Sequence, residues 1–206
     1  MREIRNDPFF DLLKRYDPNG GGRAAGEVEY HLLRDDGPYE GPGSHREALR
    51  SVFENLAEEE RAHSGERRDG RAADLPEWTF DVARARAKPL SPEAFFYCPN
   101  VMGTDARGGV RYDAGWVPDD ENIGTTVPYW YALMEPVHGK RSAPEDFKTV
   151  NGLLFPNGTD ALDVYEWTTD WSDLFDAGHE WYGACCWTVY DKSMDRYVVM
   201  LVSATD

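Results

Sequence analysis

The chain has 206 residues, of which 41% are hydrophobic and 13% aromatic, and its formal net charge at pH 7 is −16. This much apolar surface argues against a disordered chain, and no stretch approaches the ~18 consecutive apolar residues of a membrane span. The negative field repels phosphate backbones and anionic lipids, so we expect neither direct nucleic-acid binding nor membrane attachment.

The first predicted helix begins at Asp7 and Pro8, which are typical of an N-cap and a first helical position. Residues 26–33 alternate between apolar and polar side chains, which predicts a strand. Ser44-His45-Arg46-Glu47 matches a capping box, so a second and longer helix is predicted to run from there to about His63.

A polar segment of mixed charge follows at residues 64–74, where we expect a flexible loop. Residues 77–86 alternate like a half-buried strand. Pro128 leaves two alternatives open, because it can begin a helix over residues 129–134 or interrupt a strand. Ser142-Ala143-Pro144-Glu145 is a second capping box and predicts a short helix.

The C-terminal residues predict a β-hairpin at about 184–204, in which both faces of both strands are apolar. Strands of that kind are buried on two sides. We therefore predict a single α+β domain spanning residues 1–206, with an antiparallel sheet around this hairpin and helices packed on it.

The three cysteines do not indicate a disulfide framework, since their number is odd. Cys185 and Cys186 are adjacent, and neighbouring residues of a strand point to opposite faces, so they do not bridge each other. The N-terminal residues lack the apolar run and small-residue cleavage site of a signal peptide. Together these features predict a cytoplasmic protein.

The usual chemical motifs are incomplete. The five histidines and three cysteines show no paired spacing of the kind that binds zinc, so no metal is expected. Residues 119–130 resemble a calcium loop, but Trp130 stands where the glutamate is needed. No phosphate-binding loop or serine nucleophile elbow is present, and no cofactor is expected. A catalytic cysteine is disfavoured, because burial in an apolar strand makes a thiol inert.

The segment DWSDLFDAGHEWYGACCW, residues 170–187, collects carboxylates, a histidine, tryptophans and cysteines. At helical spacing Trp171, Leu174 and Phe175 form an inward stripe, so we predict an amphipathic helix that begins at an Asp170 N-cap and ends at Gly178. Asp173 would lie in the first turn, where the helix dipole favours an acid.

The junction after this helix is the candidate reactive site. Asp176 lies in the last turn, and His179 and Glu180 follow it. Two carboxylates favour the protonated form of an imidazole, so His179 can be a charge partner of Asp176. The alternatives are contact with a binding partner and proton-transfer or metal chemistry.

The acidity is also distributed unevenly. Residues 1–100 carry 15 Lys/Arg against 20 Asp/Glu, a net of −5, whereas residues 101–206 carry 7 against 18, a net of −11. The stretch 149–191 contains no lysine or arginine. Such a field speeds association with a basic protein, which predicts a basic protein partner.

Three functions are compatible with these observations. The first is a non-enzymatic binding or inhibitor protein, such as an immunity protein that neutralises a basic toxin, and its contact residues would be Asp160, Asp163, Asp170, Asp173, Asp176 and Glu180. The second is a small cytoplasmic hydrolase that uses Asp176, His179 and Glu180. The third is a nucleic-acid mimic whose carboxylates imitate a row of phosphates.

Overall fold

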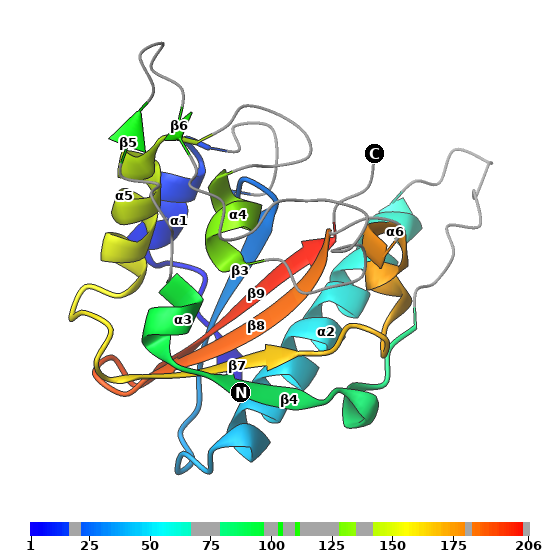
Figure 1. Cartoon of the computed structure of the whole chain (residues 1–206). Coiled ribbons are helices and arrows are strands. Elements are labelled where there is room, and N and C mark those ends of the chain that lie inside the picture. Colours follow the sequence, from blue (N-terminus) through cyan, green and yellow to red (C-terminus); the bar gives the residue numbers. More distant parts are fainter. Residues whose placement is uncertain are drawn as a thin grey trace.

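The computed structural model describes residues 1–16, 22–66, 79–96, 103–104, 110–111, 128–134, 142–179 and 183–203. Its centre is a seven-stranded antiparallel sheet with the path β1-β3-β9-β8-β7-β4, and β2 pairs with β3 beside that path. A long helix covers one face of the sheet and several short helices cover the other (Figure 1). The predicted α+β fold is confirmed.

The strands are β1 (Arg2–Glu3), β2 (Ala24–Ala25), β3 (Val28–Arg34), β4 (Ala87–Leu90), β5 (Gly103–Thr104), β6 (Val110–Arg111), β7 (Leu162–Trp167), β8 (Ala184–Asp191) and β9 (Arg196–Ser203). The helices are α1 (Pro8–Leu13), α2 (Pro42–Glu66), α3 (Pro92–Phe96), α4 (Tyr129–Met134), α5 (Pro144–Leu154) and α6 (Asp176–His179), with the 3-10 helices η1 (Val82–Arg84) and η2 (Asp173–Phe175). Strands β5 and β6 pair with each other in a second, two-stranded sheet. Among the described helices, none is long and apolar enough to cross a membrane.

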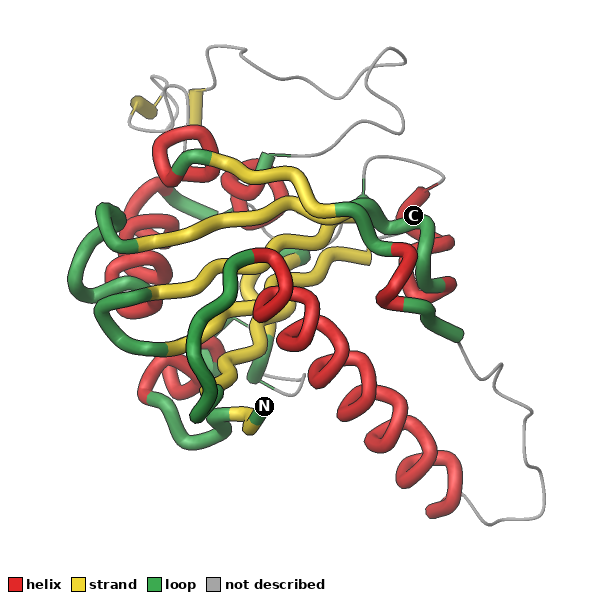
Figure 2. Tube along the Cα trace, turned by 90° about the horizontal axis from the view of Figure 1, so that it is seen from below, coloured by secondary structure: helices red, strands yellow, loops and turns green. Residues whose placement is uncertain are grey.

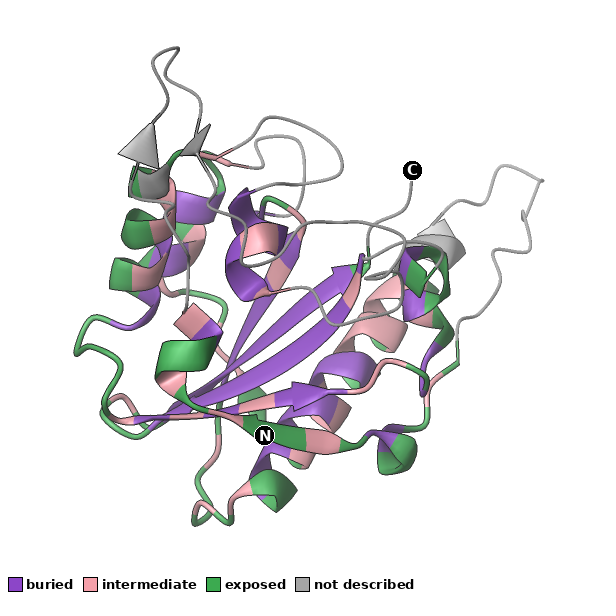
Figure 3. Cartoon of the chain, viewed as in Figure 1, coloured by how far each residue is buried: buried purple, intermediate pink, exposed green. Residues whose placement is uncertain are grey.

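The hairpin β8–β9 forms the middle of the sheet, as predicted. Trp187 and Val198 point into the core beneath α1, α3, α4 and α5, whereas Cys186 and Val199 point into the core beneath α2. Figure 3 shows both strands buried along nearly their whole length. Helices cover the core on each face of the sheet. The hairpin contributes side chains to both cores and therefore lies between the two helical layers.

Helix α1 begins where the sequence predicts. The backbone N–H of Phe9 donates to the Asp7 carboxylate at 2.9 Å, and Pro8 occupies the first turn. The helix is short, with six residues from Pro8 to Leu13. Phe9, Leu12 and Leu13 are nevertheless all buried against the sheet, which supplies most of the stability of such a short helix.

Helix α2 begins two residues before the predicted capping box. It starts at Pro42, after a Gly41 with φ of +64°, so Ser44 lies inside the helix and is not its N-cap. The Ser44 hydroxyl instead accepts a hydrogen bond from the backbone N–H of Glu40 at 2.8 Å. The helix continues through 64–66, and the remainder of the predicted loop at 64–74 lies outside the described residues.

The second capping box is displaced by one residue. The N-cap of α5 is Ala143, which has no side-chain acceptor, and the carboxylate of Asp146 accepts from its backbone N–H at 2.7 Å. Only half of the reciprocal pair is therefore formed. The ambiguous segment at Pro128 is resolved in favour of a helix, since α4 follows directly after it.

The predicted strand at 77–86 is wrong for its described part. Residues 79–81 contribute a single bridge, from Phe80 to Ser172, and the 3-10 helix η1 follows. The Asp81 carboxylate accepts from the backbone N–H of Ala83 at 3.1 Å, which turns the chain out of an extended path. The true strand is β4, one segment later, at the edge of the sheet beside β7.

Two glycines make a matched prediction about stability. Gly26 has a φ of +58°, and a Cβ there would lie 2.5 Å from the carbonyl oxygen of Leu133, so Gly26→Ala should lower the free energy of unfolding by at least about 2 kcal/mol. Gly152 lies exposed within α5 with open space around it, so Gly152→Ala should raise that free energy by about 0.5–1 kcal/mol. Urea unfolding of both variants tests the pair, and equal effects would contradict it.

Candidate functional site

The predicted helix at 170–178 begins later than expected. Ser172 is the N-cap of η2, because its hydroxyl accepts from the backbone N–H of Leu174 at 3.2 Å, and α6 follows from Asp176. Asp170 is therefore not an N-cap. Asp173 does lie in the first turn, but its carboxylate also reaches across to the 79–84 segment and accepts from the backbone N–H of Thr79 at 2.6 Å.

Gly178 does not end this helix in the way predicted. It lies inside α6, and a Cβ at this position would meet the carbonyl oxygen of Gly183 at 2.6 Å. The backbone N–H of Gly183 also donates to the carbonyl of Gly178 at 3.1 Å. The glycine thus permits a close approach of two backbone segments, which no larger residue allows.

The predicted apolar stripe holds this segment against the body of the protein. Trp171 and Phe175 are buried in the core beneath α2, and the Trp171 ring centroid lies 4.5 Å from that of Phe53. The partly buried Leu174 packs against the same core. The short helices η2 and α6 are therefore anchored to the core beneath α2.

His179 is exposed at the end of α6 and makes two polar contacts. Its Nε2 lies 2.7 Å from the hydroxyl oxygen of Thr169, and its Nδ1 lies 3.8 Å from the nearer carboxylate oxygen of Asp176. The side chain of Asp176 is 73% exposed. Glu180, the third predicted member of the junction, lies outside the described residues, so the structure brings together two of the three and adds Thr169.

These contacts define what the junction can do. A hydroxyl, an imidazole and a carboxylate follow one another in the order that activates a nucleophile, although the Asp176 contact exceeds hydrogen-bond length. A metal centre has no support in the described part of the chain, since no group of three or more His, Cys, Asp or Glu side chains there has the geometry of a site.

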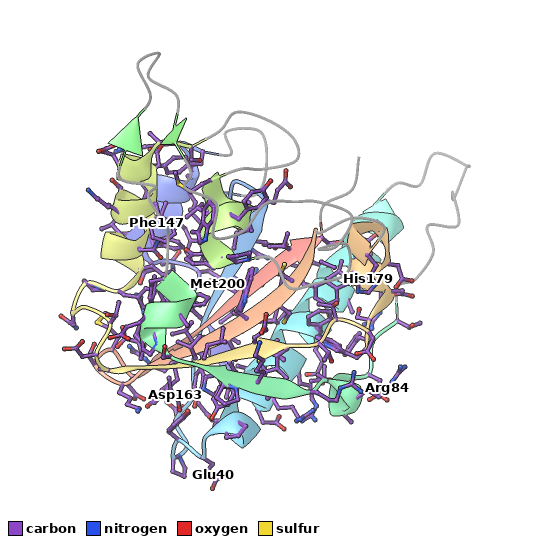
Figure 4. The ribbon with its side chains drawn as sticks, viewed as in Figure 1. Glu40, Arg84, Phe147, Asp163, His179 and Met200 are labelled. Atoms are coloured by element: carbon purple, nitrogen blue, oxygen red, sulfur yellow. The ribbon has the colours of Figure 1, made fainter. Side chains whose placement is uncertain are left out.

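The acidic residues predicted to bind a partner divide between two places. Asp170, Asp173 and Asp176 lie around η2 and α6, whereas Asp160 and Asp163 lie where β7 begins. Figure 4 shows Asp163 and His179 toward different ends of the sheet. The Asp163 carboxylate also accepts a hydrogen bond from the hydroxyl of Tyr39, so it serves an internal network.

Basic side chains on and just before β4 partly neutralise the acidic segment 149–191, which itself contains no lysine or arginine. The exposed side of β4 and the residues before it carry three basic side chains, and two of them form ion pairs with this segment. Arg86 lies 3.4 Å from Asp170, and Lys88 lies 3.1 Å from Glu166. A local count of charge along the sequence does not detect this compensation, because the paired residues are about 80 positions apart.

The adjacent cysteines are buried on opposite faces, as predicted. Cys185 belongs to the core beneath the short helices and Cys186 to the core beneath α2. Burial raises the pKa of the Cys186 thiol well above its ordinary value, which suppresses the thiolate that a nucleophile needs. Cys98 lies outside the described residues.

A polar network beneath α2 was not predicted from the sequence. Both ring nitrogens of the fully buried His45 are engaged, since Nδ1 lies 2.8 Å from the Thr188 hydroxyl and Nε2 lies 3.0 Å from the Tyr39 hydroxyl. The indole of Trp167 donates to the same Thr188 oxygen at 2.8 Å. Burial lowers the pKa of His45 to about 4, against the opposing charge of Asp163, so this imidazole is neutral near pH 7.

A charged cluster at the β1 edge of the sheet was also not predicted from the sequence. The buried His31 lies between two glutamates, with Nδ1 3.5 Å from Glu3 and Nε2 3.1 Å from Glu29. Arg23 pairs with Glu59 of α2 at 3.0 Å and lies 3.8 Å from Glu3. The cluster thereby ties β1, β3 and α2 together.

The protonation of this cluster is coupled. Burial lowers the pKa of His31, but its contacts with Glu29 and Glu3 outweigh burial and raise the pKa above the ordinary 6.5. Burial likewise raises the pKa of Glu3, but His31 and Arg23 outweigh it and bring the value to about 2. The Glu3 carboxylate is therefore charged at neutral pH, and both glutamates favour the protonated form of the His31 imidazole.

Comparison of the chain with protein-family models, with curated proteins and with solved structures returns no match.

The His31 cluster predicts a pH dependence of stability. Because the folded pKa of His31 is raised, its contribution is fully present below about pH 6.5 and is lost as the pH rises through the folded pKa. The free energy of unfolding should therefore fall as the pH rises above about 6.5, and His31→Gln should flatten that fall. Urea unfolding at closely spaced pH values measures both curves. Parallel curves for the two proteins would show that His31 is not responsible.

Proposed function

We propose that the chain is a non-enzymatic binding protein that neutralises a basic protein partner, and that Asp173 and Asp176 lie at the centre of its contact surface. The observation that carries this proposal is their exposure on a firmly anchored segment in a chain of net charge −16. An inhibitor of a basic toxin is a protein of this class.

Two features support this location. Neither Asp173 nor Asp176 forms an ion pair with a lysine or arginine among the described residues, although Asp173 accepts a hydrogen bond from Thr79 and Asp176 lies 3.8 Å from His179. The buried Trp171 and Phe175 hold the segment rigid, which reduces the entropy lost on binding. Asp170 belongs to the same surface, but Arg86 offsets its charge.

The contact is expected to act mainly on the rate of association. Charges at the rim of an interface steer the encounter and are screened by salt, whereas their effect on dissociation is small. A basic enzyme whose active site is closed by this surface would be inhibited without any reaction.

The prediction is that Asp173→Asn together with Asp176→Asn slows association with the partner about tenfold at low salt. Affinity capture from cells of the source organism, with elution by salt, supplies candidate basic proteins. Stopped-flow or surface-plasmon measurements at several salt concentrations then give the association rates with each purified candidate.

The matched control is Asp160→Asn together with Glu93→Gln. Both side chains are exposed and lie elsewhere, so this double variant has the same net charge as the test variant. Equal slowing by the two double variants would assign the effect to net charge and overturn the proposed surface. Recovery of no basic protein, or an association rate independent of salt, would overturn the proposed function.

A second candidate function, a small hydrolase, is supported by the contact between Thr169 and His179. With the imidazole neutral and its proton on Nδ1 toward Asp176, Nε2 can accept the Thr169 proton as the hydroxyl oxygen attacks an ester carbon. The leaving alcohol would then take that proton from His179, and a water molecule that gives a proton to the same imidazole would release the acyl group from Thr169 as a carboxylic acid. A nucleic-acid mimic has no comparable support, because the acids at 160–176 do not lie in one row.

The hydrolase hypothesis predicts that a panel of activated esters reveals a reaction which Thr169→Val and His179→Ala each slow by about 10²–10⁴-fold. Thr149→Val is the control, since this exposed threonine of α5 hydrogen-bonds only within its own helix. Negligible turnover by the wild type, or turnover unchanged in both variants, would remove this candidate.

A further inference from the structure

Three arginines lie in a row across neighbouring strands at one end of the sheet. In the antiparallel register Arg2 of β1 is directly opposite Arg34 of β3. Strand β3 pairs with β9 up to Leu33 opposite Tyr197, so the next position along places Arg34 beside Arg196. Like charges directly opposite each other destabilise a sheet, so the row needs a compensating charge.

The three side chains belong to the same face. Leu32 of β3 and Val198 of β9 point into the core beneath the short helices, and side chains two residues apart share a face. Arg34 and Arg196 therefore lie on that face, and Arg2 joins them because cross-strand partners point the same way. Glu3 points to the other face, toward His31.

An open cavity of about 420 Å³ lies over this row, bounded by residues 2–7, Arg34, Met194 and Arg196. It is large enough for a small-molecule ligand. Its lining carries four arginines, Arg2, Arg5, Arg34 and Arg196, against two acids, Glu3 and Asp7. In a chain that is acidic overall, this local excess of positive charge is unusual.

The two acids are already paired. Arg5 lies 2.8 Å from Glu3, and Arg196 lies 3.0 Å from Asp7. Arg34 donates only to the carbonyl oxygens of Asp195 and Met194, and no described carboxylate pairs with Arg2. The positive charges of Arg2 and Arg34 therefore remain uncompensated at the cavity.

Arg196 adds a buried positive charge to the lining of the cavity and keeps one donor without an acceptor. The residue is 2% exposed, and its two terminal nitrogens bond to Asp7 and to the carbonyl of Leu154, but its buried Nε has no hydrogen-bond partner among the described residues. A buried donor of a charged group without an acceptor is costly, so such a donor is rarely left without a ligand or an ordered water.

We propose that this cavity binds a phosphate group, held between the guanidinium groups of Arg2, Arg34 and Arg196. Guanidinium groups bind phosphate oxygens through paired hydrogen bonds, and an anion here would relieve the repulsion between Arg2 and Arg34. The site is independent of the acidic surface at Asp173 and Asp176, so either proposal can fail alone.

The test uses the whole chain and inorganic phosphate as the probe. Thermal unfolding and isothermal titration are measured in phosphate and in chloride at equal ionic strength, with acetate as a third arm. Phosphate should raise the Tm by several degrees over chloride, and Arg34→Gln and Arg2→Gln should each weaken phosphate binding about tenfold or more.

In the absence of phosphate, removal of one arginine from the row should not lower the Tm. Arg2→Gln removes a like charge from the row, so in chloride its Tm should equal or exceed that of the wild type. This outcome separates loss of binding from loss of folding. Arg50→Gln is the control, because Arg50 pairs with Glu47 on α2 and its replacement should leave phosphate binding unchanged.

Three results would overturn the proposal. The first is a phosphate effect on the wild type no larger than that of chloride. The second is a phosphate effect that persists in Arg2→Gln and Arg34→Gln, because a general salt effect does not depend on these residues. The third is stabilisation by acetate equal to that by phosphate, which would assign the cavity to carboxylates.

Discussion

The fold depends on the burial of the β8–β9 hairpin on both faces. Fifteen of the sixteen residues in Ala184–Asp191 and Arg196–Ser203 are at least partly buried, so each strand needs a layer above and a layer below. The long α2 provides one layer, and α1, α3, α4 and α5 provide the other (Figure 2). Hydrophobic burial at about 25 cal/mol per Å² makes this arrangement the main source of stability.

The two ends of this hairpin have opposite electrostatic character. The open end lies against η2 and α6, where the Ser203 hydroxyl donates to the carbonyl of Leu174 and exposed carboxylates gather. The turn end carries Arg196 and the row of arginines. Eight residues of strand separate them, which corresponds to about 25 Å. A basic partner and an anionic ligand would therefore occupy different places and need not compete.

Two continuous apolar strands made the central hairpin predictable from the sequence, alternation made β3 predictable, and a local cap made α1 predictable, because each signal depends on residues close together in the chain. Prediction failed at 77–86 and at Asp170, where the side chains of Asp81 and Ser172 bond to the backbone and set the local path. The junction at His179 was found, but its partner Thr169 was not, since no spacing pattern singles out one hydroxyl. The clusters around His31 and His45 join residues from distant segments, so only the three-dimensional structure reveals them.

Strand β4 limits how two molecules of this protein can pair through the edges of their sheets. It forms one margin of the sheet, contains Pro89, and carries the exposed Lys88 with Arg86 just before it. Proline removes a backbone donor, and the flanking charges repel a second copy of the same strand. Among the described residues, the opposite margin is formed by β1 and β2, which have two residues each. At neither margin do the described residues present a long uninterrupted edge, which disfavours edge-to-edge aggregation.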